Sequence, residues 1–192
     1  SMKQIIALVV VLLPVAQARS QDITLKPLID TRLRYESVDQ NGLATETSDA
    51  VTARLRGGFE AGSGPVSALI EGQGTLAIVD SYFDGLHGPA PRPLIADPEN
   101  IALYHAQLQY KSEVLMLTGG RQRISLDDDR FVDSAQIRQA AQTYDAVRAE
   151  WVLMPKLKAD ISYAWSVRTV WGVDGSGARP QSIPGDNVFA NL

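Results

Sequence analysis

The stretch that decides the fold is residues 157–171, which read LKADISYAWSVRTVW. Its apolar positions are Leu157, Ala159, Ile161, Tyr163, Trp165, Val167 and Trp171, and its polar positions are Lys158, Asp160, Ser162, Ser166 and Arg168. Successive side chains of a β-strand point to opposite faces of the sheet, so this order gives one apolar and one polar face. The stretch therefore predicts a strand with two unlike faces.

The same alternation recurs along the chain. It predicts further strands at Leu25–Glu36, Val51–Ala61, Val66–Val79, Ile101–Tyr110, Val114–Arg123 and Thr143–Leu153, and the start of another at Val188. In Ile101–Tyr110 the pattern assigns Ala102 and Tyr104 to the apolar face and His105 to the polar face. Several of these strands are about twice the 5–6 residues usual in soluble proteins, whereas a tilted transmembrane strand needs about 9–11.

Short and long connections alternate between the predicted strands. The short gaps are Ser63–Pro65, Lys111–Glu113 and Met154–Lys156, and the long ones are Val38–Ala50, Asp80–Asn100, Ile124–Gln142 and the final Gly172–Asn187. Short turns at one end and long loops at the other are typical of outer-membrane barrels.

A soluble β-sandwich would also alternate, but aromatic residues near the strand ends favour the membrane alternative. These are Tyr35, Tyr110, Trp151 and Trp171. The predicted fold is an all-β, antiparallel, up-and-down transmembrane β-barrel. Because the chain stops within its eighth strand, we expect residues 19–192 to form the N-terminal portion of a larger barrel, about 7–8 strands of it.

The N-terminus has the features of a secretory signal peptide. Lys3 precedes the apolar run Ile5–Leu13, and Ala16-Gln17-Ala18 supplies a cleavage site of small residues. An N-terminal anchor helix is the alternative, but this run is shorter than the roughly 20 residues that span a bilayer. We expect residues 1–18 to be the signal peptide and the protein to reside in the outer membrane of a Gram-negative envelope.

Composition excludes several kinds of chemistry. Without cysteine the chain has no thiolate nucleophile, disulfide or cysteine metal site. The two histidines, His87 and His105, have no motif partner for a catalytic triad or a metal site. Asp127–Asp129 with Asp133 could bind a hard cation, although a solvated acidic loop fits this spacing better. A formal net charge of −4 gives no reason to expect a nucleic-acid partner, and no cofactor, metal or catalytic residue is predicted.

Cations dominate the polar faces of the predicted strands. The candidate pore-lining, substrate-binding residues are Arg32, Arg34, Arg54, Arg56, Arg121, Arg123, Arg148, Arg168 and Lys158, with Lys26 on the same faces. The carboxylates there are fewer: Asp30, Glu36, Glu60, Glu71, Glu150 and Asp160. Arginine keeps its charge and grips carboxylates in a bidentate manner, so such a lumen favours anions. The alternative is a mixed lumen whose arginines only pair with carboxylates across strands.

One segment resembles a known family. Gly120–Asp127 followed by Arg130-Phe131-Val132, then Arg138-Gln139 and Gln142–Ala146, is similar to a segment of the alginate export family. Leu33–Glu36 and Arg54-Leu55-Arg56 are also similar. The chain departs from the family at Asp128-Asp129, where members often carry Asn-Gln, and at Asp133–Ile137, where they carry an aromatic-rich loop. The resemblance implies a monomeric barrel longer than this chain, whose arginine-lined lumen passes an anionic uronate polymer outward.

The function expected from these observations is an outer-membrane channel for anionic polysaccharide, oligosaccharide or small anions. The expected partners are outer-membrane lipid and lipopolysaccharide, the anionic saccharide or small-anion substrate, and periplasmic export partners. Two alternatives stay open. An outer-membrane enzyme acting on lipid or glycan would need a nucleophile–base pair, and a structural or adhesive barrel would have a plugged and less cationic lumen.

Overall fold

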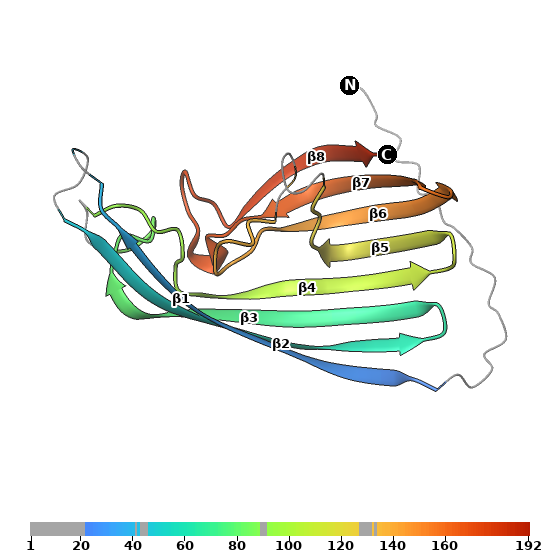
Figure 1. The fold of residues 1–192 in the computed structure, drawn as a ribbon, viewed down its shortest axis with the longest axis horizontal. Helices are drawn as coiled ribbons and strands as arrows, with labels where there is room; N and C mark the ends of the chain where they lie inside the picture. Colours follow the sequence, from blue (N-terminus) through green and yellow to red (C-terminus); the bar gives the residue numbers. More distant parts are fainter. Residues whose placement is uncertain (1–21, 41, 43–45, 89–91, 127–131, 133) are drawn as a thin grey trace, which may run out of the picture.

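The computed structural model describes residues 22–40, 42, 46–88, 92–126, 132 and 134–192. The expected signal peptide and the acidic residues Asp127–Asp129 and Asp133 lie outside these described residues. Eight strands form the molecule (Figure 1): β1 (Thr24–Val38), β2 (Ser48–Ser63), β3 (Val66–Ser81), β4 (Asn100–Lys111), β5 (Leu115–Gln122), β6 (Thr143–Met154), β7 (Leu157–Arg168) and β8 (Ser182–Asn191). A short 3₁₀ helix, η2 (Gly172–Asp174), lies between β7 and β8.

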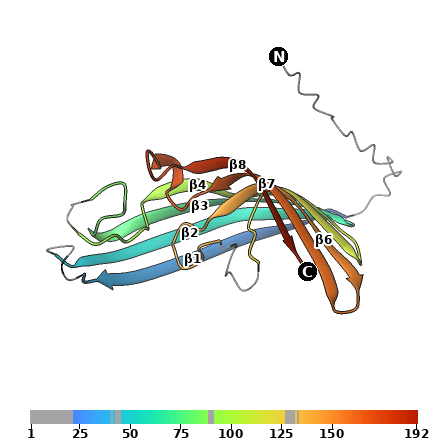
Figure 2. The ribbon, with the colours of Figure 1, turned by 90° about the horizontal axis from the view of Figure 1, so that it is seen from above.

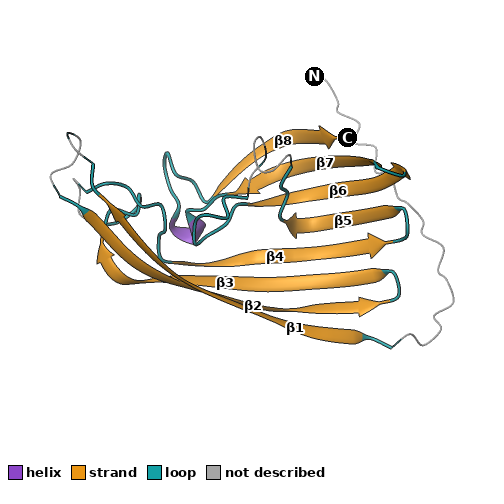
Figure 3. Ribbon diagram, in the orientation of Figure 1, coloured by secondary structure: helices purple, strands orange, loops and turns teal. Residues whose placement is uncertain are grey.

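The strands make one antiparallel sheet in the order of the sequence, β1 to β8, with β1 and β8 as its edges (Figure 3). This confirms the predicted all-β, up-and-down fold. The eighth strand begins at Ser182 rather than Val188. Pro184 and Gly185 read as loop residues, but proline is tolerated in an edge strand, and Pro184 pairs with Ser166 beside an irregularity in the ladder. No helix in the described part of the chain is long and apolar enough to cross a membrane.

The two ends of the sheet differ in their connections. Two or three residues join β2 to β3, β4 to β5 and β6 to β7 at one end, and the longer connections all lie at the other end. The sheet bends along its width (Figure 2), as strand twist requires. We call the face that the long connections pack against the inner face and the opposite one the outer face.

Large apolar side chains are exposed on the outer face. Leu33 is 70% exposed, Leu55 58% and Ile161 54%, whereas Thr52 and Ser162 of the inner face are buried. A contiguous apolar surface of this kind on a monomer marks contact with another apolar phase, here lipid.

A β-bulge in β4 reverses the expected side of Tyr104. Glu71 pairs with His105 and Gly72 with Leu103, so Tyr104 is the extra residue between them. The assignments of Ala102 and Tyr104 to the outer, apolar face are therefore wrong. Ala102 pairs with the buried Gln73 of the inner face. The Tyr104 ring is only 4% exposed and lies beneath Arg56 on the inner face, because a bulge shifts the alternation by one residue.

A second bulge changes the end of β7. Ala146 pairs with Ala164 and Asp145 with Ser166, so Trp165 is the extra residue. Beyond this point the alternation is inverted. Val167, expected on the apolar outer face, instead packs against a buried cluster of the inner face. The predicted side of β7 therefore holds only up to Trp165.

The inner face is partly covered by the chain's own connections. Ile124, Leu126 and Val132 from the β5–β6 connection pack against Tyr144 and Ala164 of the sheet. A second cluster joins Ala50 of β2 to Tyr82 and Ile95 of the β3–β4 connection. The long connections thus fold over the sheet instead of extending from its end.

The exposed outer face has a consequence for handling the protein. Expressed without residues 1–18, the chain is expected to enter inclusion bodies or to require detergent, because its apolar outer face and its two strand edges have no protein partner. Size-exclusion chromatography with light scattering measures this. A sharp monomeric peak without detergent would contradict the expectation.

Candidate functional site

The candidate site begins with four arginines on the first two strands. Arg32 pairs directly with Arg54 and Asp30 with Arg56, and directly opposed residues share a face of the sheet. Arg34 lies opposite Thr52, which is buried on the inner face. All four expected arginines of these strands, Arg32, Arg34, Arg54 and Arg56, therefore lie on the inner face, as predicted.

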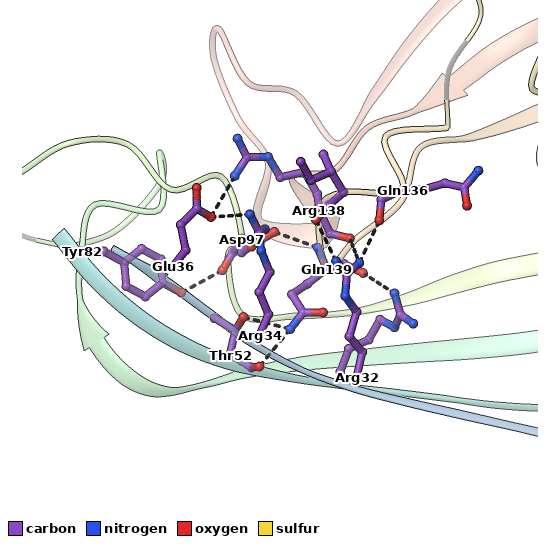
Figure 4. Close-up of polar contacts among 11 residues, drawn as sticks. Arg32, Arg34, Glu36, Thr52, Tyr82, Asp97, Gln136, Arg138 and Gln139 are labelled. Atoms are coloured by element: carbon purple, nitrogen blue, oxygen red, sulfur yellow. Dashed lines mark hydrogen bonds and ion pairs between the residues drawn. The ribbon is translucent and has the colours of Figure 1, made fainter. Parts of the chain in front are cut away.

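Arg32 anchors the β5–β6 connection through main-chain atoms. Its Nη1 donates to the carbonyl oxygens of Gln136 at 2.8 Å and Arg138 at 3.3 Å, and its Nη2 donates to that of Ile137 at 3.2 Å. Arg54 adds a longer bond from Nη1 to Gln139 O at 3.4 Å. A segment more than 100 residues later in the chain is thus held against β1 (Figure 4).

Asp97 joins three parts of the chain at one buried carboxylate. Its side chain forms an ion pair with Arg34 of β1 and accepts a hydrogen bond of 2.8 Å from the backbone N–H of Gln139. Asp97 is 1% exposed, so the charge depends on these partners. The β3–β4 connection, the β5–β6 connection and strand β1 therefore meet at this residue, as Figure 4 shows.

Two further residues complete this joint. Gln139, fully buried, donates from Nε2 to both the carbonyl and the hydroxyl oxygen of Thr52 at 2.9 Å. The Tyr82 hydroxyl donates to Asp97 O at 2.8 Å. Burial, with nearby carboxylates, raises the pKa of Tyr82, so the phenol stays protonated and remains a donor throughout the physiological range. We call Arg34, Tyr82, Asp97 and Gln139 the loop joint.

Farther toward the short turns, the inner face carries a second polar group. The Arg56 guanidinium lies 3.7 Å from the centre of the Tyr104 ring, and its Nε donates to Gln73 Oε1 at 2.7 Å. His105, beside Tyr104, has its Nδ1 2.8 Å from Glu71 Oε2. Arg56, 9% exposed, forms no ion pair with a carboxylate of the described residues and is held by Tyr104 and Gln73 instead.

Most of the other predicted cations are paired. Arg54 bridges to Asp30, and Arg34 bridges to Glu36 as well as Asp97. Arg148 of β6 contacts Asp160, with Nε to Oδ1 at 2.9 Å, and lies 3.4 Å from Glu150. Lys158 is exposed and, like Lys26, has no ion pair with the described residues. Ion pairs between strands, which were the alternative considered from the sequence, thus neutralise much of the positive charge of these residues.

Arg121 and Arg168, two of the predicted pore-lining residues, do not lie on the inner face. Both contact Asp145: Arg121 with bonds of 2.7 and 3.0 Å, Arg168 with one of 3.1 Å. Asp145 stands between Tyr144 and Ala146, which both belong to the inner cluster, so its own side chain belongs to the outer face. The register therefore assigns Arg121 and Arg168 to the outer face, because Arg121 has the parity of Leu117 and the bulge at Trp165 inverts β7. Arg123, just past β5, contacts buried Ser134 at 3.3 Å.

The sequence does not indicate Asp97 as a binding partner of Gln139, although Arg138-Gln139 belongs to the segment that resembles the alginate export family. The available signal was the apolar content of the β5–β6 segment, whose Ile124 is fully buried. Exposed loops have no need of such residues, so they indicate a loop that folds inward. No cluster of three or more His, Asp or Glu side chains that could hold a metal occurs among the described residues.

Comparison with known proteins identifies the family. The family model for alginate export, which describes outer-membrane transport proteins, matches residues 25–183 and so covers most of the chain. Comparison with curated proteins and with solved structures gave no match. The matched residues include strands β2 to β7, all of β1 but its first residue, and the four arginines of β1 and β2. The chain belongs to the alginate export family.

Proposed function

We propose that this chain forms part of the wall of an outer-membrane channel that passes anionic saccharides. The proposed substrates are a uronate polymer of the alginate type, shorter acidic oligosaccharides and small anions. The observation that carries the proposal is the inner face of β1 and β2, which holds Arg32, Arg34, Arg54 and Arg56, with Arg32 directly opposite Arg54. Guanidinium groups lining a pore lower the energy of an anion inside it.

The pairing found in the structure refines which arginines act on the substrate. Arg54 and Arg148 have carboxylate partners and contribute little net field, whereas Arg56 has none among the described residues. Arg56 is held by Tyr104 and Gln73 and is only 9% exposed, so its position is fixed and it would act on a passing anion through its field more than through direct contact. Such an attraction is weak enough to permit release.

The inward-folded connection supplies the second element of the proposed mechanism. Residues 134–139 lie against β1 and β2, on the same face as the arginines. Together with the β3–β4 connection they reduce the open section of the lumen near the long-loop end. We infer that the loop joint sets the pore width, and Arg56, farther inside, sets the preference for charge.

The test of the proposal is the ion selectivity of Arg56→Gln in planar bilayers. Removing this charge is expected to lower the anion-to-cation permeability ratio by about threefold at ~0.01 M salt and much less at ~1 M, because the Debye length falls from about 30 Å to about 3 Å. Reversal potentials under a salt gradient give the ratio directly.

Lys156→Asn is the matched control, since it removes one positive charge at the exposed β6–β7 turn. Asparagine also tolerates the left-handed backbone there, where φ is +71°. Selectivity should stay as in the parent protein. An Arg56→Gln channel with unchanged reversal potential at low salt would refute the assigned role of Arg56.

A further inference from the structure

A charged group of three residues lies on the outer face at the loop ends of β5, β6 and β7, apart from Asp49, which accepts from Tyr35, and Asp186, which accepts from Tyr163. Arg121 grips Asp145 with two hydrogen bonds, and Arg168 contacts the same carboxylate. Two guanidinium groups thus share one carboxylate, which leaves an excess of one positive charge. A third bond runs from Arg121 Nη1 to Leu103 O at 3.3 Å. Arg168, in contrast, uses only Nε, and its Nη1 and Nη2 have no partner among the described residues.

An apolar groove continues from this charged group along the outer face. Its volume is about 800 Å³, and Gly119 lies at its floor between Leu117 and Val147. Gly119 is two residues from Arg121 on the same face, and Val147 is two residues from Asp145. Only Val147 Cγ1, at 3.9 Å, would contact a Cβ at Gly119, so the floor is open. Ile161 and Tyr163 of β7 form the far wall.

The position of the charged group relative to the strands indicates its depth. It lies within two residues of the loop ends of β5 and β6 and at the last residue of β7. Trp165, 44% exposed on the outer face, adjoins it in the ladder, as expected of an interfacial aromatic residue. Charged side chains on a lipid-facing surface are tolerated at the interface but costly at the bilayer centre. At the loop ends of these strands the group would lie at the level of the outer-leaflet headgroups, with the groove toward the acyl chains.

We propose that Arg168 and Arg121, with the Gly119 groove, bind the phosphorylated glycolipid of the outer leaflet, the lipid A part of lipopolysaccharide. The proposal rests on the outer-membrane location in the proposed function. The free Nη1 and Nη2 of Arg168 match the geometry of a phosphate, which arginine binds in a bidentate manner. The excess positive charge is complementary to this anion, and the groove accepts an acyl chain of the same molecule.

The test uses the detergent-solubilised protein with bisphosphorylated lipid A as the probe, measured by native mass spectrometry. Arg168→Gln removes the unpaired guanidinium and leaves the bidentate Arg121–Asp145 pair intact. We expect it to weaken lipid A binding at least tenfold. Gly119→Leu fills the floor of the groove and should weaken binding to a similar degree with the charges unchanged. Lys156→Asn, with the same loss of charge at the opposite end of the strands, should bind within twofold of the parent.

Further measurements separate this proposal from the channel proposal. Phosphatidylethanolamine, which has no net charge, should bind at least tenfold more weakly than lipid A. Equal binding of the two lipids, or parent-like lipid A binding by Arg168→Gln, would overturn the site. The anion preference of the Arg168→Gln channel should be unchanged, because the side chain faces away from the lumen. A loss of anion preference in this variant would overturn its outward placement, whereas failure of the Arg56 test leaves the lipid measurement intact.

Discussion

Replacing Asp97 with alanine is expected to release the β5–β6 connection and to raise single-channel conductance about twofold or more. The change deletes the acceptor for the Gln139 backbone N–H and the buried partner of Arg34. Breaking a buried ion pair costs about 3–5 kcal/mol where the other charge is left without compensation, and Arg34 keeps Glu36 as a partner, so the cost here is smaller. The Arg32 bonds to residues 136–138 and the Gln139–Thr52 bonds remain, so the loss falls mainly on the docking of the main chain at Gln139. Planar-bilayer recordings measure the conductance.

Limited proteolysis gives an independent measure of the same release. Trypsin should cleave after Arg138 faster in Asp97→Ala than in the parent, because the backbone N–H of Gln139, the residue that follows, has lost its acceptor. Asp49→Ala is the matched control. Asp49 lies at the long-connection end of β2, and among the described residues its carboxylate accepts one side-chain hydrogen bond, of 3.3 Å, from the Tyr35 hydroxyl. If Asp97→Ala leaves both conductance and cleavage as in the parent, the loop joint does not hold the connection.

Gly120→Val is expected to destabilise the sheet strongly. Gly120 has φ +116°, a region that residues with a side chain rarely adopt. A Cβ there would overlap Ala106 O of β4 and would lie 3.1 Å from Gln107 Cα, both main-chain atoms that cannot move aside. Backbone strain alone costs about 1–3 kcal/mol, and the clash adds to it. We therefore expect a loss of about 3 kcal/mol or more in the free energy of unfolding.

Urea unfolding in detergent, followed by tryptophan fluorescence, measures this loss. Gly119→Ala, one residue away, is the control, because a Cβ there meets only Val147 Cγ1 at 3.9 Å. It should unfold within about 0.5 kcal/mol of the parent. A Gly120→Val protein with the parent's unfolding midpoint would show that β4 and β5 pair differently from the register described.

The fold could be predicted from alternation because the solvent differs on the two sides of every strand. Leu33 and Leu55 follow the pattern without exception, since a slip of one residue would put arginines in lipid. Tyr104 and Val167 do not follow it, because a bulge adds one residue that no periodic rule detects. The face on which Arg121 lies also depends on its position in the hydrogen-bonded ladder of strands, which is known only once the strands are paired.

The candidate site was less predictable than the fold. The alternation of side chains alone predicted that the arginines of β1 and β2 share one face, but it did not predict their partners. Asp97 and Gln139 lie in connections, and the contact between them spans 42 residues of chain. Such contacts depend on where a loop packs, for which local sequence holds only an indirect signal such as the buried Ile124.

The way in which Arg32 holds the β5–β6 connection has a consequence for how this protein family could diversify. The guanidinium hydrogen-bonds to main-chain oxygens in this segment. Its contacts therefore depend on the path of the backbone and not on the side chains along it. Ile137, whose carbonyl oxygen is one of the three acceptors, is 67% exposed. Substitutions at such positions change the side chains that the connection presents without loosening its anchorage. The anchorage of this connection and the chemistry of its side chains can therefore vary independently.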